Sequence, residues 1–401
     1  MNDLGPEAWI DRLDSPEGRA VLAALRTETG TALQVGTRLR RTWPAELVAD
    51  AQTLHALRER AAAKFSRAPE MFFTRGGWEQ SSSEVVARHR AARFTGIGPV
   101  ADLCCGIGGD LVALAARHPV LGVDRDPVHA RIAALNARAH GVAAAVTTRV
   151  ADVRDVDLAG VGAVFVDPAR RTSNADGAAR TRDVEPPLEW CFGLAATVAH
   201  VAVKAAPGLP HDLVPDGWER EFVAVGTDLK EATLWSPAFA VAHARATVLP
   251  GGHTLLPEPG DPVAVRAPGE WLLDPNPAVT RAGLVEELAR ALDAAKIDDR
   301  IAFLTLDRPV TSPFARTLRV LDAFPWREKE LPARLRSLDI GAVDVRRRGL
   351  AGDVDLLRRR LRLTGSRRAT LVMTRVADRP WALVCVDPDS PEPAPRAVSP
   401  P

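Results

Sequence analysis

The chain has 401 residues, and its 26% charged and 46% hydrophobic residues are typical of a globular protein with a substantial core. That length exceeds one compact domain, so we expect two or three units. No apolar run approaches the ~18 residues of a membrane-spanning helix, and the first residues lack the pattern of a signal peptide, which together favour the cytoplasm. The four cysteines form no C-x-x-C pair, so neither a disulfide framework nor a zinc site is expected.

The net charge of +1 conceals an uneven distribution. Residues 316–379 contain 17 Lys or Arg and 8 Asp or Glu, whereas the rest of the chain contains 35 basic and 43 acidic residues. A basic C-terminal unit attached to a mildly acidic body favours an anionic partner.

Residues 1–95 are predicted to form a helical N-terminal region. Between Glu46 and Lys64, apolar residues recur at the spacing of one helix face. Ser81 is followed three residues later by Glu84, which is the pattern of a capping box, so a helix is expected to start there.

Between residues 96 and 250 the pattern changes to short apolar runs that alternate with helices. Runs that are apolar at consecutive positions are typical of strands buried on both faces of a parallel sheet; they are residues 100–103, 120–123, 146–150, 163–166 and 198–203. Asp126 is expected to cap a helix that begins at Pro127. These features predict a doubly wound, mainly parallel α/β fold, completed by strands at 221–225, 231–235 and 244–249.

Three further segments follow. Residues 251–320 are expected to connect the units through a loop rich in Gly and Pro and a helix that starts at Asn276-Pro277. Residues 321–387 are predicted to form a small basic α+β domain with the order αβαββ, at 329–337, 342–345, 353–361, 370–374 and 381–386. Residues 388–401 are rich in proline and are expected to be disordered.

The segment from residue 100 to 110 carries the main chemical signal, because an apolar strand leads through a glycine-rich turn into a helix. The glycines let the backbone turn sharply and approach a ligand; they are Gly106, Gly108 and Gly109. Leu111 breaks the G-x-G-x-x-G pattern of a dinucleotide cradle, and Asp102 and Asp110 would repel a pyrophosphate. Those carboxylates suit the ammonium and sulfonium groups of S-adenosylmethionine, although a generic tight turn would also contain glycine.

Two acids follow at positions that suit the rest of this cofactor. Asp124 ends the second strand, 18 residues after Gly106, where a carboxylate can accept both ribose hydroxyls unless it merely caps the next helix. Asp152 follows the third strand, where it suits a hydrogen bond to the adenine amine and, equally, a turn at the end of the strand.

The next two strands end in residues that suit the methyl acceptor. Asp167-Pro168 follows the fourth strand, where ligands of open α/β sheets bind, so Asp167 is expected to orient the attacking group or the cofactor amine. Arg170 could stack on a base or pair with a phosphate, and could also be a surface arginine. Lys204 ends the fifth strand on the same rim and either contacts the substrate or reaches solvent.

The complete prediction for the site has two parts. The predicted cofactor-binding residues are Asp102, Cys104, Gly106, Gly108, Gly109, Asp110, Asp124, Arg125, Asp152, Val153 and Asp167. The predicted catalytic residues are Asp167, Pro168, Arg170 and Lys204. Cys104 and Cys105 are interpreted as small residues beneath the cofactor rather than nucleophiles. No metal site is expected, because the histidines His89, His211 and His243 are isolated.

These motifs resemble a known family. Residues 102–109 (Asp-Leu-Cys-Cys-Gly-Ile-Gly-Gly), 122–127 (Gly-Val-Asp-Arg-Asp-Pro) and 166–168 (Val-Asp-Pro) resemble the core of class I RNA methyltransferases related to trimethylguanosine synthase. The approach at 78–89 is similar too, and the whole chain resembles bacterial class I methyltransferases with a C-terminal THUMP-like domain. The resemblance is specific over 65–250 and looser over 321–387. The chain departs from it after Asp167-Pro168, where Ala169 and Arg170 replace the usual second proline and aromatic residue.

Clusters of arginine favour RNA as the partner, without distinguishing tRNA from rRNA; they lie at 346–348, 358–360 and 367–368. No interleaved aromatic residues accompany them, so a merely solvated surface stays open. The sequence thus predicts a methyltransferase that uses S-adenosylmethionine and acts on RNA near Asp167, with Phe72, Phe73 and Trp78 covering the acceptor. The alternatives are a methyltransferase for small molecules and a non-catalytic RNA-binding protein with a degenerate cofactor fold.

Overall fold

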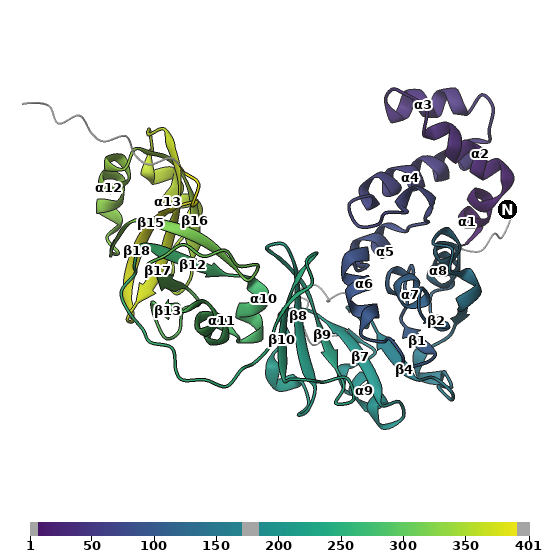
Figure 1. Cartoon of the computed structure of the whole chain (residues 1–401). Helices are drawn as coiled ribbons and strands as arrows, with labels where there is room; N and C mark the ends of the chain where they lie inside the picture. The colour runs from purple at the N-terminus through teal and green to yellow at the C-terminus, as the bar shows by residue number, and fades with distance from the viewer. Residues whose placement is uncertain (1–6, 171–183, 391–401) are drawn as a thin grey trace, which may run out of the picture. The chain divides into compact units, whose positions relative to one another are not determined.

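The computed structural model of the chain describes residues 7–170 and 184–390 (Figure 1). The chain divides into two compact units, of which one contains Met1–Glu221 and Glu231–His243 and the other contains Phe222–Lys230 and Ala244–Pro401. Most of the tail that we expect to be disordered, 388–401, lies outside the described residues.

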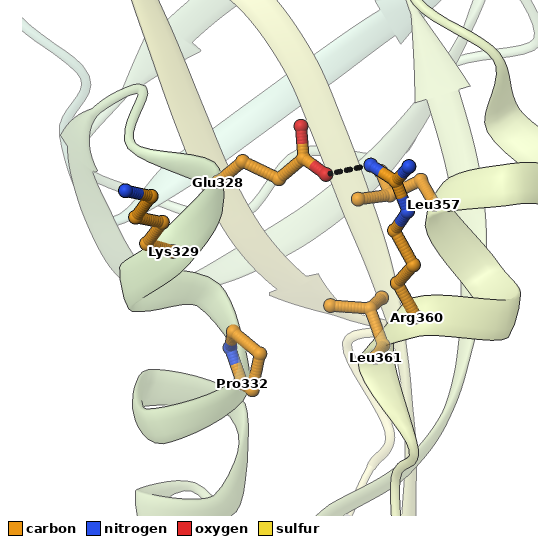
Figure 2. A pocket seen from close by; sticks show the side chains of 6 residues that line it. All are labelled: Glu328, Lys329, Pro332, Leu357, Arg360 and Leu361. Atoms are coloured by element: carbon orange, nitrogen blue, oxygen red, sulfur yellow. Dashed lines mark hydrogen bonds and ion pairs between the residues drawn. The ribbon is translucent and has the colours of Figure 1, made fainter.

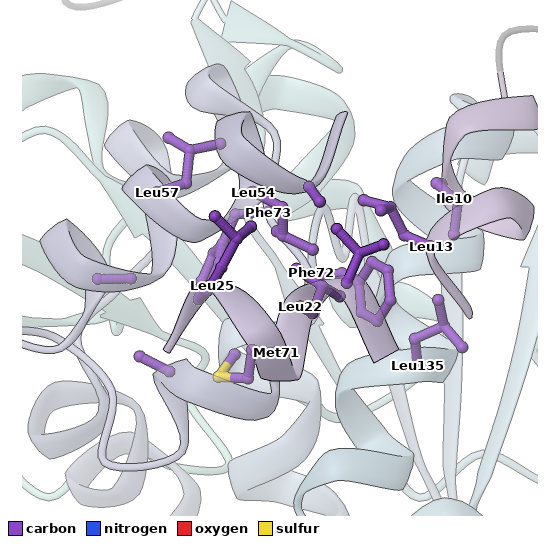
Figure 3. Close-up of a cluster of buried hydrophobic side chains, with 14 of the residues drawn as sticks. Ile10, Leu13, Leu22, Leu25, Leu54, Leu57, Met71, Phe72, Phe73 and Leu135 are labelled. Atoms are coloured by element: carbon purple, nitrogen blue, oxygen red, sulfur yellow. The ribbon is translucent and has the colours of Figure 1, made fainter. Parts of the chain in front are cut away.

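Helices form the N-terminal part of the first unit, as the sequence predicts. They are α1 (Ala8–Asp14), α2 (Pro16–Leu25), α3 (Ala32–Leu39), α4 (Ala45–Ala61), the 3-10 helix η1 (Ala68–Glu70), α5 (Arg75–Gln80) and α6 (Glu84–Ala92). Their apolar faces share one core with Ile107 and with Ile132 and Leu135 of α8 (Pro127–Ala139) (Figure 3). Because that core is continuous, the helical region is packed against the α/β part of the unit.

Helix α6 begins where the sequence predicts, but its cap differs from the expected one. Ser83 is the N-cap residue and its side chain makes no capping hydrogen bond, so the predicted capping box is wrong. The Glu84 carboxylate instead accepts hydrogen bonds from the backbone N–H and the hydroxyl of Ser66, at 2.7 and 3.0 Å. A contact distant in sequence has replaced the local one.

Within the described residues, the large sheet has the strand order β11-β10-β8-β9-β7-β4-β1-β2-β3. Its strands are β1 (Val100–Leu103), β2 (Val120–Asp124), β3 (Val146–Val150), β4 (Ala163–Val166), β7 (His200–Ala205), β8 (Glu219–Val225), β9 (Asp228–Trp235), β10 (Ala244–Leu249) and β11 (His253–Leu255). Strands β3, β2, β1, β4 and β7 are parallel, and β9 is antiparallel to β7. The chain proceeds from β1 to β3 on one side and resumes at β4 on the other, so the order reverses between β1 and β4.

Helices cover both faces of the parallel strands, which confirms the doubly wound α/β fold (Figure 1). Helices α7 (Gly109–Ala115) and α8 pack on one face, and α9 (Leu188–Gly193) packs on the other. The Asp126 carboxylate accepts the Val128 N–H at 2.9 Å and so caps α8, as expected. Strand β3 was predicted to be buried on both faces, but it lies at the edge of the sheet, and Val150 is 55% exposed.

Short elements complete the first unit. They are the 3-10 helices η2 (Ala143–Ala145), η3 (Val153–Asp155), η4 (Leu194–Ala196) and η5 (His211–Leu213), and the paired strands β5 (Ala169–Arg170) and β6 (Val184–Glu185). None of the helices within residues 7–170 and 184–390 combines the length and the apolar character that a bilayer span requires.

The second unit contains a sheet of order β13-β14-β12-β15-β18-β17-β16 among the described residues. Its elements are β12 (Trp271–Pro275), α10 (Pro277–Ala282), α11 (Val285–Leu292), β13 (Ala295–Lys296), β14 (Leu304–Leu306), β15 (Ala315–Pro325), the 3-10 helix η6 (Glu328–Glu330), α12 (Leu331–Ser337), β16 (Ile340–Arg347), α13 (Val354–Leu361), β17 (Arg367–Val376) and β18 (Arg379–Val386). The order αβαββ from α12 to β18 is the one predicted. The helix expected from Asn276 is divided in two, because Gly283 takes a left-handed conformation at φ 76° and ends α10.

A buried ionic cluster joins α6 to the rest of the first unit. The Arg90 guanidinium, on a residue only 2% exposed, pairs with Asp110 of α7 and with Glu231 of β9, and it lies 4.7 Å from the Phe165 ring centroid. The Ser82 hydroxyl also donates to Glu231, at 3.3 Å. Two buried carboxylates therefore depend on one guanidinium for their charge compensation.

We expect Arg90→Met to lower the free energy of unfolding by ~3–5 kcal/mol, because it leaves Asp110 and Glu231 buried without a counter-ion. Arg88→Met on the same helix is the matched control, since Arg88 is largely exposed and its pair with Glu84 should contribute less than ~1 kcal/mol. Urea denaturation of both variants measures the difference. Equal losses would contradict the assignment of the cluster as an anchor.

Candidate active site

The glycine-rich turn lies where the strand order reverses, at the carboxyl end of β1. Cys104, Gly106 and Gly108 have positive φ values of 61°, 54° and 82°. A Cβ atom added at Gly106 would meet no heavy atom within 4 Å, whereas one at Gly108 would lie 3.1 Å from the Ala133 backbone. Gly106 therefore faces open space that a ligand can enter, and Gly108 permits the turn to pack on α8.

Asp124 lies directly against this turn. Its two carboxylate oxygens accept hydrogen bonds from the Gly106 N–H at 2.8 Å and from the Asp126 N–H at 2.9 Å. The acid at the end of β2 is thus held at the crevice by the backbone, and its remaining lone pairs are available to ribose hydroxyls. Asp126 caps α8, as the sequence predicts, and the ribose role of Asp124 stays a prediction.

Asp102 is the most unusual acid of the site. It is 1% exposed on β1, and neither carboxylate oxygen has a hydrogen-bond partner among the described residues. Burial, followed by the charge of the nearby Asp167, raises the pKa of Asp102 well above its ordinary value. An orphaned buried acid beside an open crevice fits a cationic ligand group, so the donor set agrees with the ammonium of S-adenosylmethionine.

Asp110, also predicted to bind the cofactor, has a different environment. Its carboxylate is buried and occupied by Arg90, which the sequence reading did not single out. No spacing rule in the sequence connects Arg90 of α6 with Asp110 or Glu231.

The predicted adenine side of the site lies at the end of β3. The Asp152 carboxylate caps η3 by accepting the Arg154 N–H at 3.0 Å, and it also pairs with the Arg154 guanidinium at 2.6 Å. These hydrogen bonds lower the pKa of Asp152 to about 2. Val153 is buried and Arg125 is exposed. The turn-capping role and an adenine contact are compatible, because a carboxylate accepts more than the bonds it makes here.

Asp167 directly follows β4, on the other side of the point between β1 and β4 where the strand order reverses. Its N–H donates to the Leu103 carbonyl at 3.1 Å, and its carboxylate is 2.7 Å from the Lys204 ammonium. Pro168 is buried, and the chain then enters β5, where Arg170 pairs with Val184 of β6. The side chain of Arg170 lies outside the described part, so its two predicted roles stay predictions.

The aromatic cover expected over the acceptor is different in the structure. Phe72 and Phe73 are 6% and 1% exposed within the N-terminal core, where Figure 3 shows them among aliphatic side chains. That part of the prediction is wrong, because these rings are needed to pack the helices. Trp78 of α5 is only partly buried, but it packs against the same core, and the Lys64 ammonium lies 5.6 Å from its ring centroid, so its predicted place over the acceptor stays a prediction.

The cysteines of the turn are thiols rather than thiolates. Burial, followed by the Asp124 charge, raises the pKa of Cys104, and burial followed by the Asp102 charge raises that of Cys105. Within residues 7–170 and 184–390, no group of three or more His, Cys, Asp or Glu side chains is placed to hold a metal ion.

The chain belongs to the S-adenosylmethionine-dependent methyltransferases. It is 36% identical over 334 residues to proteins of Mycobacterium tuberculosis strains CDC 1551 / Oshkosh and H37Rv, each described as an uncharacterized S-adenosylmethionine-dependent methyltransferase; the match covers 80% of this chain and 90% of theirs. The chain is therefore an enzyme whose cofactor is S-adenosylmethionine, as the glycine turn and its acids predict.

Further comparisons agree with this family and with the resemblance found in the sequence. A family model described as RNA cap guanine-N2 methyltransferase matches residues 97–201, one described as THUMP domain-like matches 315–386, and a domain of unknown function matches 8–61. A protein of Porphyromonas gingivalis W83, solved as a candidate methyltransferase, shares the fold with a TM-score of 0.67 at 19% identity, over 87% of this chain and 92% of that one.

We expect Asp102→Asn to stabilise the protein in a pH-dependent way. The raised pKa keeps Asp102 protonated in the folded chain at a pH where the unfolded chain has released that proton. Unfolding is then favoured as pH rises above ~4, by ~1.4 kcal/mol per pH unit until the folded-state pKa is reached. Asparagine does not ionise, so the free energy of unfolding of the variant should rise relative to that of the parent between ~pH 5 and ~pH 7, as measured by urea denaturation.

The control for this measurement is Asp216→Asn, which changes an exposed aspartate far along the chain. Its difference from the parent should be the same at both pH values. A constant difference for Asp102→Asn as well would mean that the folded chain does not suppress ionisation of Asp102.

Proposed function

We propose that the protein transfers the methyl group of S-adenosylmethionine to a nucleobase, or to another nucleophile of RNA, that is held beside Asp167. The observation that carries this proposal is that Asp124 and Asp167 end β2 and β4 beside the glycine turn that follows β1, while β1 itself carries the buried Asp102, whose carboxyl oxygens have no hydrogen-bond partner among the described residues. The bound cofactor supplies an activated methyl group. The chain itself has to align the acceptor and exclude water, with little acid–base work.

Each acid has a distinct role in this proposal. Asp124 accepts the ribose hydroxyls, because its carboxylate is fixed at the turn by two backbone N–H groups. Asp102 receives the cofactor ammonium, which would give its buried carboxylate the cation that the described residues do not supply by hydrogen bonding. Asp152 accepts the adenine amine. Asp167 and the carbonyl of Pro168 orient the acceptor for in-line attack.

RNA as the substrate is supported by the names of the two matching family models, one for an RNA methyltransferase and one for a THUMP-like domain. The second unit adds a physical argument. A pocket of about 380 Å³ lies between η6 and the start of α12 on one side and α13 on the other, lined by Glu328, Lys329, Pro332, Leu357, Arg360 and Leu361 (Figure 2). Its floor is apolar and its rim charged, which suits a base with its phosphate.

The arginine clusters do not contribute equally to that surface. The Arg348 guanidinium forms an ion pair with Asp274 at 2.9 Å and donates a hydrogen bond to the Ala302 carbonyl at 2.6 Å. We therefore assign Arg348 a structural role and not an RNA contact. Arg358 and Arg359 on α13 are exposed, and Arg360 beside them pairs with Glu328 at 3.1 Å across the pocket. We therefore place the phosphate contacts on α13.

Asp124→Ala tests the cofactor site. We expect the affinity for S-adenosylmethionine to fall about 10- to 100-fold in calorimetry, because hydrogen bonds to a charged acceptor contribute ~1.5–3 kcal/mol. Asp126→Ala is the control: it removes the adjacent carboxylate and the cap of α8 but should keep the affinity within about threefold. An unchanged affinity in Asp124→Ala would refute the ribose assignment.

The double variant Arg358→Ala/Arg359→Ala tests the RNA surface. Its affinity for bulk RNA should fall, and the slope of log affinity against log salt should become shallower by ~1.4, since each contact on a single strand contributes ~0.7. Arg19→Ala/Arg67→Ala removes the same charge from the N-terminal region and should leave the slope unchanged. Equal slopes in all three proteins would contradict the placement on α13.

The reaction itself is tested with labelled S-adenosylmethionine and total RNA from a strain that lacks the protein, followed by mass spectrometry of the nucleosides. We expect one methylated nucleoside to appear, and to be absent with Asp167→Ala. If the cofactor binds and no nucleoside is labelled, the RNA substrate is refuted and an acceptor of low molecular weight becomes the better proposal.

A further inference from the structure

The carboxyl end of α5 is held by two lysine side chains. The Lys64 ammonium donates to the carbonyls of Trp78 at 2.8 Å, Ser81 at 3.1 Å and Glu79 at 3.3 Å. The Lys204 ammonium donates a hydrogen bond to the carbonyl of Gln80, at 3.4 Å. Four successive carbonyls, which a helix end leaves without partners of its own, are therefore bound by cations from two different parts of the chain.

Lys204 differs from Lys64 because it also reaches the acceptor carboxylate. Strands β4 and β7 pair in register, with Val166 opposite Val203, so Lys204 follows directly beside Asp167. Its ammonium is 2.7 Å from the Asp167 carboxylate, and its side chain is only 14% exposed. One buried cation thus connects the end of α5 with the residue that faces the acceptor.

Helix α5 also touches the cofactor turn. A Cβ atom added at Gly77 would lie 2.3 Å from the Ile107 side chain, and one added at Gly109 would lie 3.4 Å from that of Ser81. The segment from Gly77 to Ser81 is therefore packed on the turn without spare room. A shift of this segment therefore displaces the turn on which it packs.

We propose that Lys204 is a positioning residue. Its ammonium fixes the Asp167 carboxylate and the carboxyl end of α5 relative to each other, so that the two move together. The proposal rests on the proposed function for its consequence in methyl transfer, but not for the coupling itself. Lys204 acts through Asp167 and does not contact the methyl acceptor. Lys64 binds three other carbonyls of the same helix end.

Hydrogen exchange of the protein without cofactor or RNA tests the coupling. We expect Lys204→Met to raise the exchange of peptides spanning residues 75–83 about tenfold, which corresponds to the loss of a charged hydrogen bond. Asp167→Ala should raise it in the same peptides, because Lys204 loses the partner that holds it there. The double variant should exchange no faster than Lys204→Met.

Lys64→Met is the matched control. It should also raise exchange in 75–83, but its effect should add to that of Asp167→Ala, because Lys204 is the residue that contacts both Asp167 and the helix end. The coupling is refuted if Asp167→Ala leaves 75–83 unchanged, or if the effects of Lys204→Met and Asp167→Ala add fully. This readout needs no activity, so it stands or falls independently of the proposed substrate.

Steady-state methylation then tests the consequence. Lys204→Met should lower kcat about 10- to 100-fold and change KM for S-adenosylmethionine less than threefold, because the ribose and ammonium contacts are intact. Lys204→Arg should recover part of kcat, since a guanidinium can span the same two partners. A rise in KM for the cofactor with unchanged kcat would overturn the positioning role, as would a Lys204→Arg variant no better than Lys204→Met.

Discussion

The reversal of strand order between β1 and β4 is the constraint on which the site depends. It brings the ends of β1, β2 and β4 to one edge of the sheet, and with them Asp102, Asp124 and Asp167. Like charges so close, and in part buried, are unfavourable unless cations or N–H donors compensate them. Backbone N–H groups donate hydrogen bonds to Asp124, and the Lys204 ammonium pairs with Asp167. Asp102 has no hydrogen-bond partner in the described residues, and burial raises its pKa. The fold thus gathers three acids at the edge of the sheet where we propose that the sulfonium cofactor binds.

The same electrostatic logic fixes the N-terminal helices. Arg90 compensates Asp110 and Glu231, and three residues later Arg93 compensates Glu219 at 2.6 Å, so one face of α6 neutralises acids of α7, β8 and β9. Replacing such pairs by apolar residues can preserve stability, but removing one partner cannot. Helix α6 is therefore held by pairing that specifies its position. Because the Ser82 hydroxyl joins this cluster, the loop that ends α5 is also placed by it.

The sequence predicted the site best where chemistry is local in the chain. The spacing from Gly106 to Asp124 follows from one strand–helix–strand repeat, and the cap at Asp126 from its neighbour Pro127, so the structure agrees with both. The partners Arg90, Glu231 and Lys64 escaped prediction because they lie on segments far apart in sequence that only the folded sheet brings together. Strand β15 was not predicted for a different reason: apolar and charged residues are mixed between its buried residues Leu318 and Phe324, without the strict alternation that marks a strand.

The residues after Pro168 show how an acceptor site can lack the aromatic residue of related enzymes. Ala169 enters β5 at once and is exposed, and Arg170, which occupies the position of that aromatic residue, pairs through its backbone with Val184 of β6. Phe72 and Phe73 are committed to the core, which leaves α5 as the described element beside the rim that can supply apolar surface. Stacking on a base depends on how firmly its platform is held. Lys64 and Lys204 bind the carbonyls from Trp78 to Ser81, so the end of α5 is held without any ring in the Asp-Pro motif itself. Under the proposal made for Lys204, discrimination of the acceptor depends on the placement of α5 relative to Asp167.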